Sequence, residues 1–405
     1  MATAVRIVHE QGIIGFCALH HRRMEPSLSV TQPQAGRGPG ARRRPSLAAL
    51  AGALAAAAAS CLLLAVCVLV AFDWAAAGRE TEAQETSAPP SGRLLHAFPL
   101  DSTFGRVFVQ EWGPRDATPI LISHGTGAWS GFWAGIGQDL ARAGYRVVAV
   151  DLPPFGFSDR APNARAGRAD QAARLVGVLD ELDACRGVLL GHSFGAGPVV
   201  EALLRHPQRL VGAVLISPDL SLPPDGEEPP PASNIVDLVL GSETLARMLT
   251  AATLSNPLLT RRFLASMLAQ EATATEDQAD ILRRPLRRAG TTPAYADWLP
   301  YLLEPDLEAL SRRAEALRSI ERPVGIVFGE ADPVVPVAAG RRIAGLIPGA
   351  SIDVLPGVGH VPHVEAPAEM LRTLVAQLER IAPEATRPGA PRRLDLNACR
   401  LGGTN

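Results

Sequence analysis

Residues 187–200 read Gly187-Val-Leu-Leu-Gly-His192-Ser193-Phe194-Gly195-Ala-Gly-Pro-Val-Val. The apolar residues at the start of this stretch predict a buried strand, and the residues at its end predict a helix. A G-x-S-x-G pattern therefore falls on the turn between strand and helix. Such a turn projects the Ser193 hydroxyl from the end of the strand, and the Phe194 amide lies at the start of the helix, where backbone dipoles favour negative charge. We therefore interpret Ser193 as a nucleophile. The alternative is a chance match in a chain with 37 glycines.

A serine hydroxyl is a weak nucleophile that needs a base, and the base needs a carboxylate to orient it. A histidine and a carboxylate each follow a predicted strand later in the chain. Because these strands are parallel to the one before Ser193, both residues reach the same edge of the sheet as Ser193. Asp332 comes soon after the strand predicted at 324–328, and His360 comes soon after the strand predicted at 351–355. We expect Ser193, Asp332 and His360 to form one catalytic set.

Three other residues compete for these roles. Glu330 lies just before Asp332, and Asp219 follows an earlier strand. His363 follows His360 closely enough to make an H-x-x-H pattern, which also occurs in metal sites. No H-E-x-x-H helix and no third ligand accompany this pattern in the sequence, so we expect neither a metal nor a cofactor.

The stretch His124-Gly-Thr126-Gly follows the strand predicted at 119–123 and places a glycine-rich turn at the same edge of the sheet. We expect the backbone amides of Thr126 and Phe194 to be the two donors of an oxyanion hole. Three aromatic residues come directly afterwards and form a candidate apolar wall of the substrate pocket: Trp129, Phe132 and Trp133. Core packing of the first helix is the alternative for all three.

Short and nearly continuous apolar runs predict strands that are buried on both faces. These runs are 119–123, 146–150, 187–190, 210–216, 324–328 and 351–355. Helical periodicity separates most of them, and the predicted helices are 169–182, 197–205, 338–347 and 366–381. The alternation predicts an α/β fold with a mostly parallel sheet and helices on both faces, after a first hairpin of 94–99 and 107–112.

Residues 221–320 contain no predicted strand. They begin with a proline-rich stretch and continue with helix-like segments around 235–249, 260–268, 276–286 and 307–320. A helical insertion at one point of an α/β sheet predicts a cap over the strand ends. The core of the domain would then consist of residues 93–220 and 321–382.

Residues 46–72 carry no charge and are long enough to span the hydrocarbon core of a bilayer. Arginines 42–44 precede this run and acidic residues follow it, so the positive-inside rule predicts a signal anchor with a cytoplasmic N-terminus and an outer catalytic domain. A signal peptide cleaved near 75–78, giving a secreted protein, is the alternative. Residues 1–45 would be a disordered basic arm, 73–92 a linker and 383–405 a disordered tail.

The composition excludes several function classes. Lys+Arg total 39 against 41 Asp+Glu, which gives a net charge of −2. The chain therefore has no overall excess of basic residues for binding the phosphate backbone of a nucleic acid. The sequence has no lysine, which excludes mechanisms that need a catalytic amine. Its five cysteines form no C-x-x-C pair, so they indicate neither zinc nor redox chemistry.

Five motifs in this order resemble the α/β-hydrolase superfamily, in its cap-containing branch of esterases and carbon–carbon bond hydrolases. They are HGTG (124–127), DLPPFGFSD (151–159), GHSFGAG (191–197), GEADPVVP (329–336) and GVGHVPHVEAP (357–367). The resemblance implies Ser193 as nucleophile, His360 as base and Asp332 as its orienting acid, with the oxyanion donors named above. Serine at the nucleophile position argues against the dehalogenase and epoxide hydrolase members that use a carboxylate. Pro154 stands where relatives often carry glycine.

Together with the uncharged run, the resemblance leads us to expect a membrane-anchored serine hydrolase that cleaves a carboxylic ester of small or medium apolar acyl groups. Hydrolysis of a carbon–carbon bond in a dienoic ketone, or acyl transfer, is the enzymatic alternative. A non-catalytic receptor that binds a ligand in the same pocket is an alternative of a different class.

Overall fold

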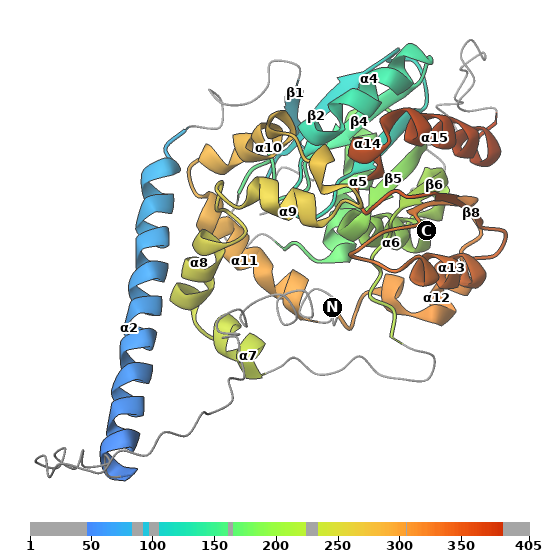
Figure 1. Cartoon of the computed structure of the whole chain (residues 1–405). Coiled ribbons are helices and arrows are strands. Elements are labelled where there is room, and N and C mark those ends of the chain that lie inside the picture. Colours follow the sequence, from blue (N-terminus) through green and yellow to red (C-terminus); the bar gives the residue numbers. More distant parts are fainter. Residues whose placement is uncertain are drawn as a thin grey trace, which may run out of the picture. The chain divides into compact units, whose positions relative to one another are not determined.

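The computed structural model describes residues 47–82, 92–96, 105–160, 165–223, 234–304 and 306–383. An eight-stranded sheet with the order β1-β2-β4-β3-β5-β6-β7-β8 forms its centre (Figure 1). The strands are β1 (Gly92–Leu95), β2 (Val107–Trp112), β3 (Pro119–Ser123), β4 (Arg146–Val150), β5 (Gly187–His192), β6 (Leu210–Ile216), β7 (Val324–Gly329) and β8 (Ser351–Leu355). β1 and β2 form an antiparallel hairpin, and the strands from β3 to β8 are parallel. The mostly parallel sheet predicted from the apolar runs is confirmed.

Helices cover both faces of this sheet, which explains why its strands are apolar without alternation. Successive residues of β5 enter different cores: Leu189 packs in one, and Val188 and Leu190 pack in the other. The first core contains residues of α5 (Arg168–Glu181), α6 (Ala196–Arg205), α12 (Ala314–Arg318) and α13 (Val337–Leu346). The second contains residues of α4 (Ala134–Arg142) and α15 (Pro367–Ile381), which follows the short α14 (Pro362–Glu365).

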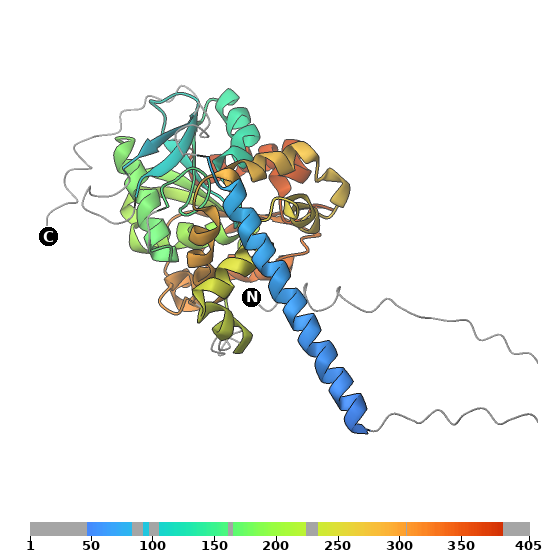
Figure 2. The ribbon, with the colours of Figure 1, turned by 90° about the vertical axis from the view of Figure 1, so that its left-hand side faces the viewer.

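Five helices inserted between β6 and β7 form a separate group, which we call the cap helices. They are α7 (Asn234–Leu240), α8 (Glu243–Ala252), α9 (Thr260–Ser266), α10 (Glu276–Arg283) and α11 (Thr291–Leu303). They lie together on the left of the domain in Figure 1, and the turned view of Figure 2 brings them to the front. The helix predicted at 235–249 is two helices, because Gly241 interrupts it. α11 was not predicted, because it contains Pro300.

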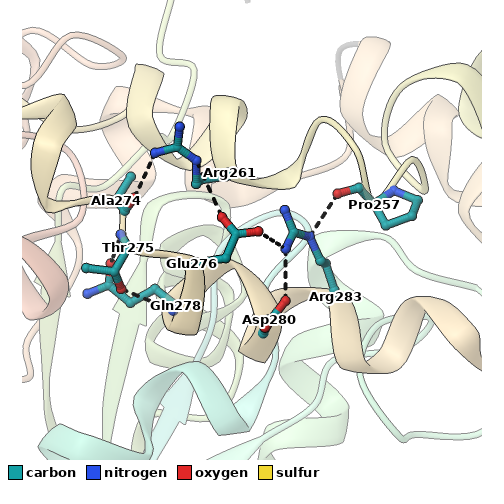
Figure 3. A network of polar contacts seen from close by, with 8 residues as sticks. All are labelled: Pro257, Arg261, Ala274, Thr275, Glu276, Gln278, Asp280 and Arg283. Atoms are coloured by element: carbon teal, nitrogen blue, oxygen red, sulfur yellow. Dashed lines mark hydrogen bonds and ion pairs between the residues drawn. The ribbon is translucent and has the colours of Figure 1, made fainter.

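A polar network holds α9 and α10 together (Figure 3). The Arg283 guanidinium donates to the Pro257 carbonyl at 2.9 Å and to carboxylates of Glu276 and Asp280 on its own helix. Glu276 also lies 3.5 Å from the Arg261 guanidinium of α9. Thr275 caps α10 through a reciprocal pair of hydrogen bonds with Gln278.

α2 (Leu47–Arg79) includes residues 47–72 of the uncharged run predicted at 46–72 and continues beyond it. Its segment Leu54–Arg79 is long and apolar enough to cross a membrane. Contacts divide the chain within this helix, so that residues up to Val68 belong to one unit and those from Leu69 onward to another. The arm predicted at 1–45 lies outside the described residues, as does the predicted tail beyond residue 383.

The last glycine of the G-x-S-x-G pattern gives a test of how tightly this fold is packed. A Cβ atom on Gly195 would lie 2.3 Å from the His124 carbonyl oxygen and 2.5 Å from that of Ser123, whereas a Cβ on Gly345 in α13 would meet nothing within 4 Å. We expect Gly195→Ala to lower the free energy of unfolding by about 1–3 kcal/mol through overpacking. Gly345→Ala should leave it unchanged or raise it by about 0.5–1 kcal/mol. Thermal unfolding of the full chain in detergent measures both, and equal melting temperatures for the two variants would contradict this packing.

Candidate functional site

Ser193 lies on a sharp turn between β5 and α6. Its φ angle of 52° is in the left-handed region, which costs energy for a residue with a side chain and is frequent at functional sites. The glycines on either side explain why the sequence makes this turn. A Cβ on Gly191 would lie 2.7 Å from Ala196 Cα, and Gly195 packs against the carbonyl of His124. The turn leaves the Ser193 side chain half-buried, within reach of solvent.

A chain of hydrogen bonds connects Ser193 with the ends of β7 and β8. Ser193 Oγ and His360 Nε2 are 2.8 Å apart, and His360 Nδ1 and Asp332 Oδ2 are also 2.8 Å apart. The other oxygen of Asp332 accepts from the backbone amides of Val334 and Val335, both at 2.8 Å. An ionised Asp332 only accepts, so His360 Nδ1 carries the hydrogen and Nε2 is free to accept from the serine.

The three competing residues lie elsewhere. Glu330 accepts from the Gly357 amide at 3.3 Å, and Asp219 accepts from the amide and hydroxyl of Ser221. His363 is buried and stacks on Trp133, with ring centroids 3.8 Å apart. No hydrogen bond joins the side chain of Glu330, Asp219 or His363 to that of Ser193 or His360, and Asp219 contacts Ser193 through its backbone amide, which donates to the Ser193 carbonyl at 3.3 Å. Across the described ranges, no cluster of three or more His, Cys, Asp or Glu side chains is arranged to hold a metal ion.

The other histidines around Ser193 are neutral. His124 donates through Nδ1 to the Gly125 carbonyl and accepts at Nε2 from the Leu152 amide, and burial lowers its pKa to about 4. His192 donates through Nε2 to the His360 carbonyl at 2.9 Å, and burial lowers its pKa to about 3. Burial also lowers the pKa of His363 well below its ordinary value. His124 and His192 therefore position backbone groups at pH 7, and none of the three rings places a positive charge beside Ser193.

The glycine-rich turn after β3 packs directly on the nucleophile turn. A Cβ on Gly125 would lie 3.2 Å from Ser193 Cβ and 2.9 Å from His192 Nδ1. Thr126 is the next residue and is half-buried, while the Phe194 side chain is buried. The structure thus brings the two turns predicted to carry oxyanion donors next to each other.

The aromatic residues predicted as a pocket wall are placed mainly as packing residues. Trp133 is fully buried against His363, and Phe132 lies at 5.1 Å from the same ring. Trp129 is buried against Phe157, with its indole N–H donating 2.7 Å to the Ile281 carbonyl of α10. Their positions agree with the core-packing alternative.

A different apolar cluster lies against Phe194, the residue after Ser193. Its buried members include Phe155 from the loop after β4 and two aromatic residues of α11, Tyr295 and Trp298. The Trp298 ring lies 5.2 Å from the Phe194 ring and 4.8 Å from that of Phe155. Sequence reasoning missed this wall because the helix that carries it contains Pro300. A groove of about 530 Å³ between α9 and α10 contains none of the three hydrogen-bonded residues.

Glu365 holds the loop that carries His360, a role that the sequence analysis did not assign. One of its oxygens accepts from the Gly359 amide and the other from the Gln270 amide after α9, each at 2.6 Å. The His360 amide donates to the Met267 carbonyl at 2.8 Å. Two of these hydrogen bonds, from Gln270 and to Met267, connect the cap with the segment around His360, and the third holds the histidine loop to α14.

Glu365→Gln tests this connection. The amide group of glutamine presents N–H to one of two backbone N–H donors, so one hydrogen bond is lost and the His360 loop loosens. We expect the Ser193 hydroxyl to react about tenfold more slowly with a fluorophosphonate probe, because the base is less well oriented. Glu379→Gln, at an exposed position of α15, is the matched control and should react at the wild-type rate. Equal rates in both variants would refute a positioning role of Glu365.

The sequence was compared with known proteins. Residues 118–367 match the family of the alpha/beta hydrolase fold. A 2-hydroxymuconate semialdehyde hydrolase from Pseudomonas putida is 26% identical over 269 residues, which cover 65% of this chain and 89% of that protein. An uncharacterized carboxylesterase, nap, from Bacillus subtilis (strain 168) is 26% identical over 273 residues, covering 67% of this chain and 82% of that protein.

A similar fold is found in solved structures. A membrane phospholipase A matches with a TM-score of 0.54 and 23% identity, covering 83% of this chain and 98% of that chain. At this identity the likeness concerns the fold alone. The family match spans more than half of the sequence, and the parallel sheet, the nucleophile turn and the helices on both faces agree with it. This chain therefore belongs to the alpha/beta hydrolase fold family.

Proposed function

We propose that this hydrolase cleaves a carboxylic ester, or a related acyl bond, with Ser193 as nucleophile, His360 as base and Asp332 as orienting acid. The observation that carries the proposal is the continuous chain of 2.8 Å hydrogen bonds from Ser193 through His360 to Asp332. The strained backbone of Ser193 also supports this role. A φ angle of 52° costs energy for a residue with a side chain, and such strain is frequent where a side chain is held in a functional position.

In the first half-reaction Ser193 Oγ attacks the carbonyl carbon while its proton moves to His360 Nε2. Asp332 stabilises the resulting imidazolium through Nδ1–H. The amides of Phe194 and Thr126 donate to the negative oxygen of the tetrahedral intermediate. When the intermediate collapses, His360 gives its proton to the leaving alkoxide, and the acyl group stays on Ser193. Water then gives a proton to His360 and attacks the acyl carbon, which releases the acid and restores the hydroxyl.

The apolar cluster beside Phe194 favours an apolar acyl group over a charged one. Phe155, Tyr295 and Trp298 are aromatic, and Leu254 packs against them. Burying methylene groups against such a surface contributes about 0.8 kcal/mol each. We therefore propose a small or medium apolar acyl chain as the substrate class.

Hydrolysis of a carbon–carbon bond is the second candidate, because the relative from Pseudomonas putida is named for a semialdehyde hydrolase. The same residues would act, but the leaving group would be a carbon atom that must be protonated. Turnover of a dienoic ketone with no turnover of p-nitrophenyl esters would favour this candidate over the first. Transfer to an added alcohol in place of water would indicate an acyltransferase.

We also propose that α2 anchors the chain in a membrane, with the N-terminus in the cytoplasm and the catalytic domain on the outer side. The uncharged run and the arginines before it support this placement. Cys185 takes part in a disulfide, a bond that persists in oxidising compartments. Release of the domain after cleavage of the helix is the alternative.

Substitutions in the hydrogen-bond chain test the catalytic proposal in the full-length protein in detergent. Ser193→Ala should lower kcat for p-nitrophenyl butyrate by about 10⁴-fold or more, because no nucleophile remains. Asp332→Asn should lower it by about 10³- to 10⁴-fold, because asparagine stabilises neither the tautomer nor the charge of His360. Glu330→Gln is the matched control with a change in the same loop and should retain wild-type activity. Wild-type protein that neither turns over esters nor is labelled at Ser193 by a fluorophosphonate would support the receptor alternative instead.

Protease added to intact cells tests the topology. We expect it to digest the catalytic domain without lysis, since the positive-inside rule places that domain outside. A cytoplasmic marker protein should survive until the cells are lysed. A domain that is degraded only after lysis would contradict the proposed orientation, and a domain found free in the medium would favour cleavage of the helix.

A further inference from the structure

Residues 73–82, which we call the strap, follow the uncharged run and pack against the cap helices. Asp73 forms an ion pair of 3.0 Å with Arg247 of α8. Ala76, one turn further along α2, is only 1% exposed. This part of the chain was predicted as a linker, yet the Ala76 side chain is buried and Asp73 forms an ion pair. The ion pair is partly exposed and contributes little by itself, so the burial of the strap matters more.

Glu80 supplies a cap for α11 from a distant part of the sequence. Both carboxylate oxygens lie within 3.1 Å of the Thr292 amide, and one also accepts from the Thr292 hydroxyl. The residue before α11 is Gly290, with φ 75° and no side chain that could satisfy these donors. A carboxylate at this position also faces the positive end of the helix dipole. Burial raises the pKa of Glu80, while hydrogen bonds from Thr292 and the charge of Arg160 oppose that rise.

Glu82 continues the strap along the segment before α11 through its backbone. Its amide donates to the Arg287 carbonyl at 3.1 Å, and its carbonyl accepts from the Ala289 amide at 3.0 Å. Arg288, between these two residues, is buried and donates to the carbonyls of Gly156 and Ser158 in the loop after β4. The strap is thus connected through its partner segment to a loop of the catalytic core.

α11 transmits the position of the strap to the active site. Its residue Trp298 packs 5.2 Å from the ring of Phe194, whose amide is a proposed oxyanion donor. Tyr295, on the same helix, packs on Phe155 with ring centroids 4.8 Å apart. A shift or fraying of α11 at its N-terminal end would therefore disturb the apolar packing on Phe155 and Phe194.

We propose that the strap belongs to the substrate-binding half of the enzyme, and that Glu80 is a positioning residue that sets α11 and so determines which acyl chains the site accepts. This inference rests on the proposed ester hydrolysis. Trp298 and Tyr295 are each 1% exposed, so they support the surface beside Phe194 from behind, and we expect a longer apolar acyl chain to depend on that support more than an acetyl group does. Loss of Glu80 should accordingly weaken the binding of long acyl chains and spare the chemistry of the triad.

The test compares Glu80→Ala, Glu80→Gln and Glu82→Gln in the full-length protein in detergent. Glu82→Gln is the matched control, because the contacts of Glu82 with the segment before α11 run mainly through its backbone. For p-nitrophenyl octanoate we expect Glu80→Ala to lower kcat/KM about five- to tenfold, mainly through KM, as for the loss of a helix cap. Glu80→Gln keeps one acceptor oxygen, so its kcat/KM should lie between that of Glu80→Ala and that of the wild type. For p-nitrophenyl acetate all three variants should match the wild type. An equal loss with both esters, or no loss with octanoate, overturns the proposal.

Hydrogen exchange separates this inference from the proposed function, since it needs no turnover. The amides at the start of α11, including that of Thr292, should exchange about tenfold faster in Glu80→Ala than in Glu82→Gln. Wild-type protein that hydrolyses no ester and is not labelled at Ser193 would end the proposed function. In that case faster exchange still supports Glu80 as the residue that holds α11, and unchanged exchange overturns that role.

Discussion

The turn after β5 packs against the turn after β3 at a distance that only glycine allows, and the reactive groups depend on this contact. Gly195 lies so close to the carbonyls of Ser123 and His124 that no side chain fits between them. With the backbone held there, Ser193 adopts a left-handed conformation whose cost is of order 1–3 kcal/mol. Burial of β5 between two apolar cores offsets that cost. His360 and Asp332 then reach Ser193 from loops that follow two neighbouring parallel strands.

Two of the contacts that hold the cap helices differ in kind. On one side the loop after α9 hydrogen-bonds to Glu365 and to the backbone of His360, so it contacts the base itself. On the other side α11 is capped by Glu80 and packs on Phe194, the residue after the nucleophile. The cap helices therefore contact both the loop of His360 and the side chain of Phe194.

Burial explains why so many histidines can surround one serine. His124, His192 and His363 are buried, and desolvation lowers the pKa of each. For His192 the desolvation outweighs the opposing charge of Asp332, so the rings act as neutral donors and packing groups. His360 differs in geometry, since it alone of these four hydrogen-bonds both a carboxylate and the Ser193 hydroxyl.

The strands were predictable from the sequence because a strand buried on both faces must be apolar at every position, and 119–123 and 351–355 have the same bounds in the structure. The cap was predictable only in outline. Gly241 breaks one expected helix, and α11 forms in spite of Pro300 because its aromatic residues are buried against the core. Tertiary packing there outweighs the local preference.

The sequence alone accounts for the positions of the strands, the turn at Ser193 and the edge of the sheet where the candidate carboxylates and histidines gather. These follow from local patterns, because apolar runs place strand ends and glycines permit one specific turn. The tertiary structure decided which carboxylate and which histidine complete the hydrogen-bond chain, and it turned Trp129 and Trp133 into packing residues. It also joined Glu80 to Thr292, 212 residues apart. Contacts of that kind depend on how whole elements pack, and no local periodicity encodes them.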